Sequence, residues 1–187
     1  MSIKKKTVLN VVFMAFVVSF FVTPLGYHSK IFLNRLFSGT PDIIAGNTRE
    51  QIKDYNWRLK DADWNIFNFS KSKDKVVFIN FWASWRLPCA AELQSIQNLY
   101  DRYKGQIDFY IITNEEQAPV EEFMNKNEFT FPVTYLIIGD ASPLAILKPP
   151  GSYILDSKGF IVVKEEGIAD WDNNKIDTLL DEMLSEK

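Results

Sequence analysis

Apolar residues along this chain fall into short runs and helical stripes that follow one another in alternation. Runs rich in β-branched and aromatic residues predict strands at 57–60, 64–69, 75–81, 106–113, 152–156 and 160–164. The run at 75–81 is almost continuously apolar, which is typical of a central strand that is buried on both faces. The tight-turn sequence at 157–159 joins the last two strands into a predicted hairpin.

Segments with helical periodicity lie between these strands and after the last one. After the sequence WRLPC at 85–89, apolar residues at three-to-four spacing predict a helix through Tyr103. A short helix is expected around Pro119, a residue favoured at helix starts, and the last helix is expected over 172–184. The run at 131–138 is apolar but ambiguous. This order implies parallel strand–helix–strand units and a late antiparallel hairpin, so we predict an α/β fold with a central mixed β-sheet and helices on both faces.

The N-terminal part has a different pattern. Lys4, Lys5 and Lys6 precede a run at 7–25 that carries no charge and matches the roughly 20 residues of a membrane-spanning helix. We predict that the chain is divided into four segments: a cytoplasmic basic tail (1–6), a transmembrane signal-anchor (7–26), a connector (27–54) and a globular domain (55–187). The lysine cluster favours an orientation that places the domain outside the cytoplasm.

Two alternatives remain open in this part. A cleaved signal peptide is the rival of the anchor, but no pair of small residues suited to cleavage occurs between Phe20 and Lys30. The apolar residues at 31–37 lie among Lys30 and Arg35, a pattern that suits an amphipathic segment at the membrane face. A helical continuation of the anchor is the other interpretation of that segment.

Composition narrows the possible chemistry. The net charge of −3 argues against a nucleic-acid-binding protein, because such proteins normally carry a basic surface patch. The single cysteine excludes an intramolecular disulfide, and with only one histidine a metal site built from Cys and His is not expected, because a closed site needs about four ligands. We predict neither a metal nor a cofactor.

The segment 78–89, FINFWASWRLPC, resembles the active-site strand and turn of the TlpA-like, membrane-anchored thiol–disulfide oxidoreductases of bacteria. PGSYILD at 150–156 and GIADW at 167–171 are similar to later segments of the same family, and the likeness spans roughly 55–184. The resemblance implies a thioredoxin-like fold. It also implies that Arg86 takes the place of the nucleophilic first cysteine and Cys89 that of the resolving cysteine.

Other roles follow from the same resemblance. Trp85 is the tryptophan before the motif, and Pro150 is the cis-proline that faces the site. The backbone beside Pro150 is then expected to offer free polar groups to an extended peptide. Asn80 lies where thioredoxins hold a buried acid, and Glu92 is expected to be a solvated or helix-capping charge.

A guanidinium group is not a nucleophile, so Arg86 excludes dithiol exchange within this chain. We predict a single-pass protein of the bacterial inner (cytoplasmic) membrane whose domain faces the periplasm. It has lost dithiol redox activity and binds an extended peptide or envelope protein through Trp85, Arg86 and Pro150. One alternative is a monothiol oxidoreductase that uses Cys89 with an external resolving thiol. Another is a structural scaffold subunit of the envelope.

Overall fold

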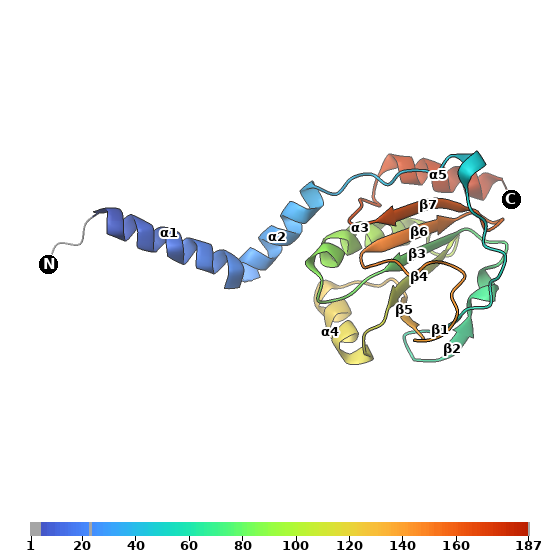
Figure 1. Cartoon of the computed structure of the whole chain (residues 1–187), viewed down its shortest axis with the longest axis horizontal. Helices are drawn as coiled ribbons and strands as arrows, with labels where there is room; N and C mark the ends of the chain where they lie inside the picture. Colours follow the sequence, from blue (N-terminus) through green and yellow to red (C-terminus); the bar gives the residue numbers. More distant parts are fainter. Residues whose placement is uncertain (1–4, 23, 187) are drawn as a thin grey trace.

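The computed structural model describes residues 5–22 and 24–186, in which a helical N-terminal part leads into an α/β domain (Figure 1). The helices are α1 (Lys5–Val22), α2 (Pro24–Leu36), α3 (Leu87–Tyr103), α4 (Gln117–Asn127) and α5 (Asn174–Ser185). The strands are β1 (Arg58–Lys60), β2 (Ile66–Asn68), β3 (Val77–Phe81), β4 (Asp108–Thr113), β5 (Val133–Leu136), β6 (Gly151–Leu155) and β7 (Ile161–Glu166). Two short 3-10 helices are η1 (Gly46–Thr48) and η2 (Phe69–Ser72).

The strands form one sheet in the order β2-β1-β5-β4-β3-β6-β7. β3, β4 and β5 run parallel, whereas β1, β2, β6 and β7 pair antiparallel with their neighbours. The predicted mixed sheet is therefore confirmed. All five residues of β3 are buried, as expected for a strand in the middle of a sheet.

Helices α3, α4 and α5 all contribute to one hydrophobic cluster, which lies on one face of the sheet and includes Leu93, Val120 and Leu180. The other face is covered by η2 and by loop residues such as Trp57 and Leu147. The prediction of helices on both faces is therefore wrong. The units β3-α3-β4 and β4-α4-β5 step across the sheet in the same direction, and right-handed crossovers then leave both helices on the same face.

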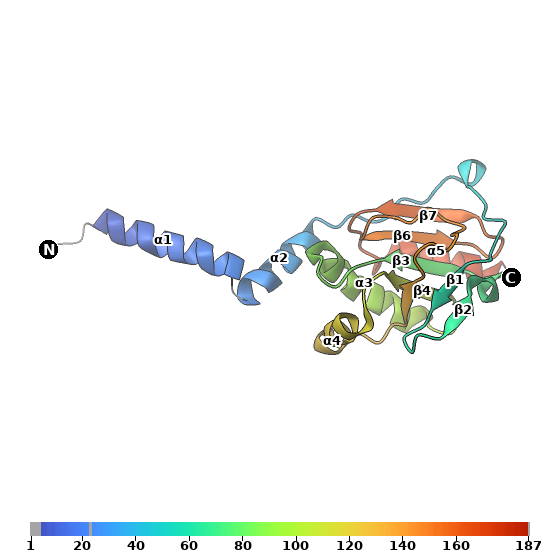
Figure 2. The ribbon, with the colours of Figure 1, turned by 60° about the horizontal axis from the view of Figure 1, so that its bottom comes forward.

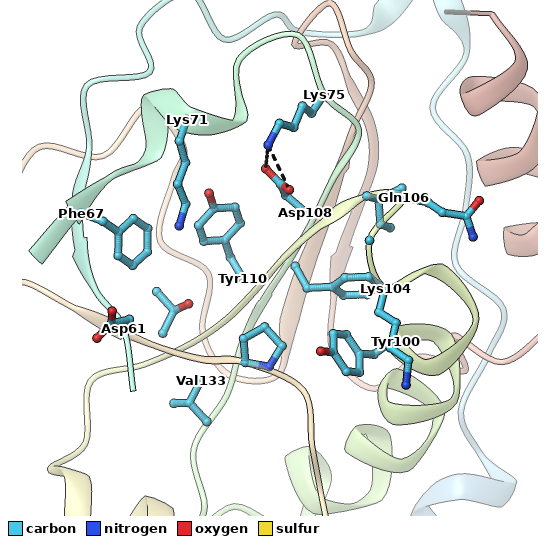
Figure 3. A pocket seen from close by; sticks show the side chains of 15 residues that line it. Asp61, Phe67, Lys71, Lys75, Tyr100, Lys104, Gln106, Asp108, Tyr110 and Val133 are labelled. Carbon is cyan, nitrogen blue, oxygen red and sulfur yellow. Dashed lines mark hydrogen bonds and ion pairs between the residues drawn. The ribbon is translucent and has the colours of Figure 1, made fainter. Parts of the chain in front are cut away.

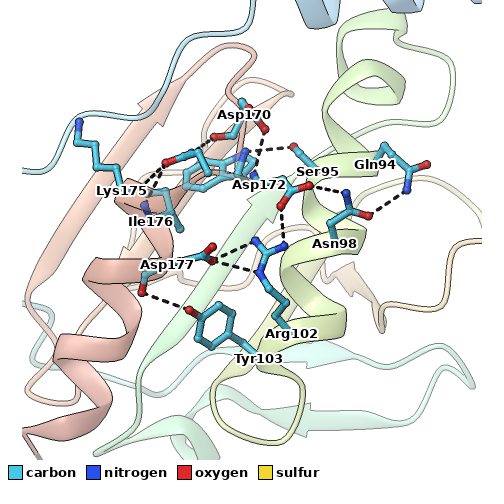
Figure 4. A network of polar contacts seen from close by, with 12 residues as sticks. Gln94, Ser95, Asn98, Arg102, Tyr103, Asp170, Asp172, Lys175, Ile176 and Asp177 are labelled. Atoms are coloured by element: carbon cyan, nitrogen blue, oxygen red, sulfur yellow. Dashed lines mark hydrogen bonds and ion pairs between the residues drawn. The ribbon is translucent and has the colours of Figure 1, made fainter.

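A polar network fixes α3 against the start of α5 (Figure 4). The Arg102 guanidinium pairs with Asp172 at 2.6 Å and with Asp177 at 3.0 Å. The Tyr103 hydroxyl donates to the Asp181 carboxylate at 3.0 Å. At the start of α5, the Asn173 side chain accepts hydrogen bonds from two backbone N–H groups and so caps the helix.

The connector runs along the outer edge of the sheet before it reaches β1. Single bridges join Gly39 to Ala169, Ile43 to Val163 and Gln51 to Phe160, so the β7 edge is partly covered. In the turn that follows β6, Gly159 has φ +82, and a Cβ there would lie 3.0 Å from the Ile52 carbonyl oxygen. Glycine is required at this turn both by backbone conformation and by the close approach of the connector.

The predicted anchor at 7–26 and its basic tail at 1–6 fall partly outside the described residues, because residues 1–4 and 23 are not described. Across the ranges 5–22 and 24–186, no helix combines the length and the apolar character needed to cross a membrane. The amphipathic segment predicted at 31–37 is helical as far as Leu36, as the last part of α2.

Candidate functional site at the start of α3

The site begins where β3 ends and the chain turns into α3. The Trp82 N–H donates to the Ile112 carbonyl at 2.9 Å, which extends the parallel pairing by one residue. The Arg86 N–H donates to the Ala83 carbonyl at 3.2 Å and closes a tight turn. Arg86 is the N-cap of α3, and its carbonyl accepts the first helical hydrogen bond from Ala90 at 3.1 Å. The predicted turn-to-helix junction is therefore present.

Glu115 holds this turn from the neighbouring strand, a role that the sequence did not indicate. Its carboxylate accepts from the Ser84 backbone N–H and from the Ser84 hydroxyl, both at 2.7 Å. The Thr113 hydroxyl donates to the same carboxylate at 3.1 Å. Glu115 lies two residues after the end of β4, which is beside β3 in the sheet, so its position depends on the parallel pairing of the two strands.

Trp85 and Arg86 form the outer surface of the turn. The Trp85 side chain is 72% exposed, unusually high for a tryptophan. The Arg86 guanidinium carbon lies 5.5 Å from the centre of the Trp85 ring, within cation–π range. The Arg86 side chain makes no capping hydrogen bond to α3, so the cation stays with the tryptophan at the surface.

Cys89 lies in the first turn of α3 and is completely buried in the hydrophobic cluster. The pKa of the Cys89 thiol is raised to about 12, chiefly because the thiol is buried. The backbone of Ala83 and the charge of Arg86 lower the pKa, but by less than burial raises it. Cys89 is therefore a protonated thiol at neutral pH and has no exposed surface.

Pro150 lies at the end of β6 that meets the end of β3, where Gly151 pairs with Phe81. The Pro149–Pro150 peptide bond is cis, which confirms the predicted isomer. The expectation of free backbone groups needs correction, because the Pro150 carbonyl accepts from the Gly167 N–H at 3.0 Å and Pro149 has no N–H. The described contacts join Trp85 to Arg86 but do not join either of them to Pro150.

A small cavity of about 90 Å³ opens beside Pro149 at the carboxyl ends of β3, β4 and β5. Its walls include Trp82, Ile146 and Leu147. Pockets that hold small molecules usually have several hundred Å³. This cavity is therefore of a size for one apolar side chain.

Glu92 is buried rather than solvated, so the expectation of a surface or capping charge is wrong. Its carboxyl group accepts from the Trp171 indole N–H at 2.6 Å and from the Ala169 N–H at 3.3 Å. The Asn80 amide donates to it at 3.3 Å and also to the Ser152 hydroxyl at 2.9 Å. Burial raises the Glu92 pKa to about 8, although these hydrogen bonds lower it. Glu92 follows Cys89 by three residues on the same helix, and this spacing could have predicted that both side chains lie on the buried face.

A larger cavity, of about 470 Å³, lies away from this site at the amino ends of β4 and β5 (Figure 3). In it, the Lys71 ammonium lies 3.8 Å from the centre of the Phe67 ring, and Lys75 pairs with Asp108 at 3.1 Å. The Tyr110 hydroxyl is hydrogen-bonded to Ser72. Its polar groups are thus largely paired with one another, and neither Cys89 nor the turn before α3 lines it.

Comparison with known proteins identifies the family. The model of the AhpC/TSA family matches residues 49–164, which is more than half of the chain. The chain belongs to the AhpC/TSA family. The chain is 29% identical over 149 residues to the thiol-disulfide oxidoreductase ResA of Bacillus subtilis (strain 168), covering 75% of this chain and 76% of ResA. It is 27% identical over 116 residues to the thioredoxin-like protein YneN of the same organism, covering 60% of this chain and 67% of YneN.

Solved structures support the same fold. A crystal structure of a putative thiol:disulfide interchange protein DsbE from Chlorobium tepidum superposes with a TM-score of 0.60, covers 73% of this chain and 96% of that protein, and is 19% identical. At this identity the likeness shows the fold alone. The thioredoxin-like α/β fold with a mixed sheet is therefore established for this AhpC/TSA-family chain.

Proposed function

We propose that this chain is a thioredoxin-like protein of the thiol–disulfide oxidoreductase type that has lost dithiol exchange and has kept a binding role. The names of its relatives, thiol-disulfide oxidoreductase ResA and thioredoxin-like protein YneN, support the class of chemistry from which it derives. The proposal rests on two features of this site. Arg86 occupies the helix N-cap, and the single cysteine, Cys89, is fully buried.

Dithiol exchange requires one thiolate that attacks a partner's disulfide and a second thiol that resolves the mixed disulfide. This chain has one cysteine, and the group at the exposed end of α3 is a guanidinium, which does not attack sulfur. With a pKa of about 12, the Cys89 thiol supplies almost no thiolate at neutral pH. These features argue against a monothiol cycle as well, because such a cycle also begins with an accessible thiolate.

The binding role rests on the surface that surrounds the same turn. Trp85 is an exposed aromatic residue of the kind enriched at interfaces, and Arg86 adds a planar cation that pairs well with carboxylates. The cavity beside Pro149 has room for one apolar side chain. We infer that the partner is an extended peptide or envelope-protein segment that inserts an apolar side chain there and places an acidic group near Arg86.

Neither Pro149 nor Pro150 has a backbone N–H, and the Pro150 carbonyl already accepts from Gly167, so this residue pair donates no backbone hydrogen bond to such a segment. Recognition would therefore rest mainly on side chains, with less contribution from strand addition than the resemblance implies. This predicts that binding depends strongly on the sequence of the partner segment.

We further propose that the N-terminal part anchors the domain to the inner membrane, with the domain on the periplasmic side. Support comes from the three lysines at 4–6, which precede an uncharged run up to residue 25. Membrane fractionation with a carbonate wash tests the anchor, and release of the full chain into the wash would contradict it.

The rate of alkylation of Cys89 in the folded protein, measured against pH, tests the loss of redox chemistry. We expect negligible reaction until the domain is unfolded, and no insulin-disulfide reduction above the level of a Cys89→Ala control. A fast reaction with a midpoint well below the free-thiol value of about 8.5 would overturn the proposal in favour of a monothiol enzyme.

Binding is tested with an immobilised array of extended peptides, comparing the native chain with Trp85→Ala and Arg86→Ala. We expect both substitutions to weaken capture of the peptides that the native chain selects, while Cys89→Ala leaves it unchanged. A partner that binds equally well to all four proteins would instead favour a scaffold role through another surface.

A further inference from the structure

Four large apolar side chains at the end of α2 are exposed on one side of the helix. Phe32, Leu33, Leu36 and Phe37 have exposed fractions of 66%, 44%, 67% and 82%. Their spacing along the chain places them on neighbouring positions of one helical face, which we call the α2 apolar face. A contiguous apolar patch of this kind on a folded protein marks an interaction site.

The other side of α2 is attached to the domain. The Arg35 side chain donates from Nε to the Ala91 carbonyl of α3 at 3.1 Å. Ile31 and Gln94 line a cavity between the two helices, and Phe32, although 66% exposed, borders the same cavity at the edge of the α2 apolar face. Both views of the ribbon place the end of α2 beside the start of α3 (Figures 1 and 2). The α2 apolar face therefore has a defined orientation relative to the domain.

The charge of the chain indicates what covers this face. Five of the 21 basic residues and none of the 24 acidic residues lie before Asp42. The N-terminal part is thus purely cationic, whereas the domain is acidic. Anionic lipid headgroups attract such a segment, by about 1 kcal/mol for each Lys or Arg near the surface.

A second apolar surface precedes the α2 apolar face along the chain, on α1. Most large side chains of α1 are exposed, among them Leu9, Phe13 and Phe16. A helix with apolar side chains on one face and cations at its edge binds in the plane of the bilayer interface. A bilayer therefore accommodates both helices, with α1 as the proposed anchor and α2 at the interface.

We propose that α2 lies in the headgroup region of an anionic bilayer, with Phe32, Leu33, Leu36 and Phe37 inserted among the lipids. This rests on the proposed membrane anchoring. Ala91, which contacts α2, is five residues beyond Arg86, a rise of about 7.5 Å along α3. The turn with Trp85 and Arg86 is thereby held on the membrane-proximal side of the domain. Its partners are then segments of membrane-bound proteins that emerge close to the lipid surface.

The test uses the full chain with an environment-sensitive fluorophore attached at position 36 through Leu36→Cys. Cys89 is buried and does not compete for the label. Ser185→Cys at the exposed end of α5 is the matched control. Both proteins are reconstituted in vesicles of phosphatidylcholine and phosphatidylglycerol and recovered by flotation. Quenching is then measured with soluble iodide and with nitroxide-labelled lipid.

We expect the label at position 36 to emit at shorter wavelength, to be quenched by the lipid nitroxide, and to be at least about threefold less sensitive to iodide than the label at position 185. If the protein floats with the vesicles but both labels are equally sensitive to iodide, the anchoring stands and the α2 inference is overturned. Protection from iodide without quenching by the lipid nitroxide would show a protein occupant and would also overturn it. If the protein does not float, the proposed anchoring itself fails.

Discussion

The carboxyl group of Glu92 accepts a 2.6 Å hydrogen bond from the indole of Trp171 in the interior of the domain. The two residues are 79 positions apart in the sequence, so this bond joins α3 to the segment before α5. It is a buried polar contact one helical turn from Cys89. Because Glu92 is only 1% exposed, its protonation depends on the fold, and the stability of the fold depends on pH.

We predict that the protein becomes less stable as pH rises from about 5 to about 8. The folded pKa of Glu92 is raised to about 8, whereas the unfolded group titrates near its ordinary value of about 4.5. Between these values the folded state binds more protons than the unfolded state. The stability that Glu92 contributes is therefore fully present below pH ~4.5 and is lost as pH rises through 8. The expected loss is on the order of a few kcal/mol, measured by urea unfolding across this range.

Glu92→Gln should remove most of this pH dependence, because glutamine does not titrate. Its side-chain oxygen can still accept from the Trp171 indole and the Ala169 N–H. Glu122→Gln, at an exposed position of α4, is the control and should keep the native slope. Equal slopes for the native chain and Glu92→Gln would contradict the assignment.

A second prediction concerns the carboxylate that holds the turn before α3. Glu115→Ala removes the acceptor of two 2.7 Å hydrogen bonds from Ser84 and should lower the free energy of unfolding by about 2 kcal/mol. Amide hydrogen exchange at Ser84 should accelerate. Glu116→Ala is the control, because the Glu116 side chain makes no capping bond and is exposed. If both variants had the same stability, Ser84 would be held by something other than Glu115.

Local patterns predicted the elements that hold the site. The apolar run at 75–81 contains β3, WRLPC precedes α3, and the cis bond at Pro150 followed from the family resemblance. These features depend on nearby residues or on a motif, so the sequence contains the necessary information. The amphipathic stripe of the last helix likewise matches α5.

The features that the sequence did not reveal depend on long-range pairing. The burial of Glu92 requires Trp171 and Asn80, which approach it only after the sheet has formed. The bond between Pro150 and Gly167 depends on the pairing of β6 with β7. The common face of α3 and α4 follows from the strand order, which periodicity does not encode. Each of these differences changes the chemistry expected at the site.

A third prediction tests whether Cys89 acts only as a packing residue. Cys89→Ala leaves a small cavity in the core, whereas Cys89→Ser places a hydroxyl in apolar surroundings. The Ala83 backbone is a polar neighbour of this hydroxyl but satisfies only part of it. A poorly paired buried hydroxyl costs about 1–3 kcal/mol, so Cys89→Ser should be less stable than Cys89→Ala by at least about 1 kcal/mol. Urea unfolding of the two variants under identical conditions measures the difference. Equal stabilities within about 0.5 kcal/mol would indicate that the side chain at position 89 reaches water or a polar partner.

The last prediction restores the missing half of the dithiol. Arg86 caps α3, and Cys89 lies three residues later on the same side of the helix start. Residues at this spacing have Cβ atoms about 5–6 Å apart, close enough for a disulfide after small adjustments. A new thiol at the helix N-terminus should also have a lowered pKa, because the helix dipole stabilises a thiolate there. Arg86→Cys should therefore form a disulfide with Cys89 that is reversible over a series of glutathione ratios, measured by gel shift after thiol alkylation.

Leu87→Cys is the matched control, since residues two apart on a helix do not face each other, and it should remain reduced under the same conditions. An Arg86→Cys protein that folds but stays fully alkylatable at every glutathione ratio would show that the Cys89 sulfur is turned away from the helix start. In that case Arg86 would not occupy the position of the attacking cysteine, and the proposed origin of this protein from a dithiol enzyme would lose its main support. A reversible disulfide would instead mean that one substitution restores a dithiol in a protein for which we propose a binding role.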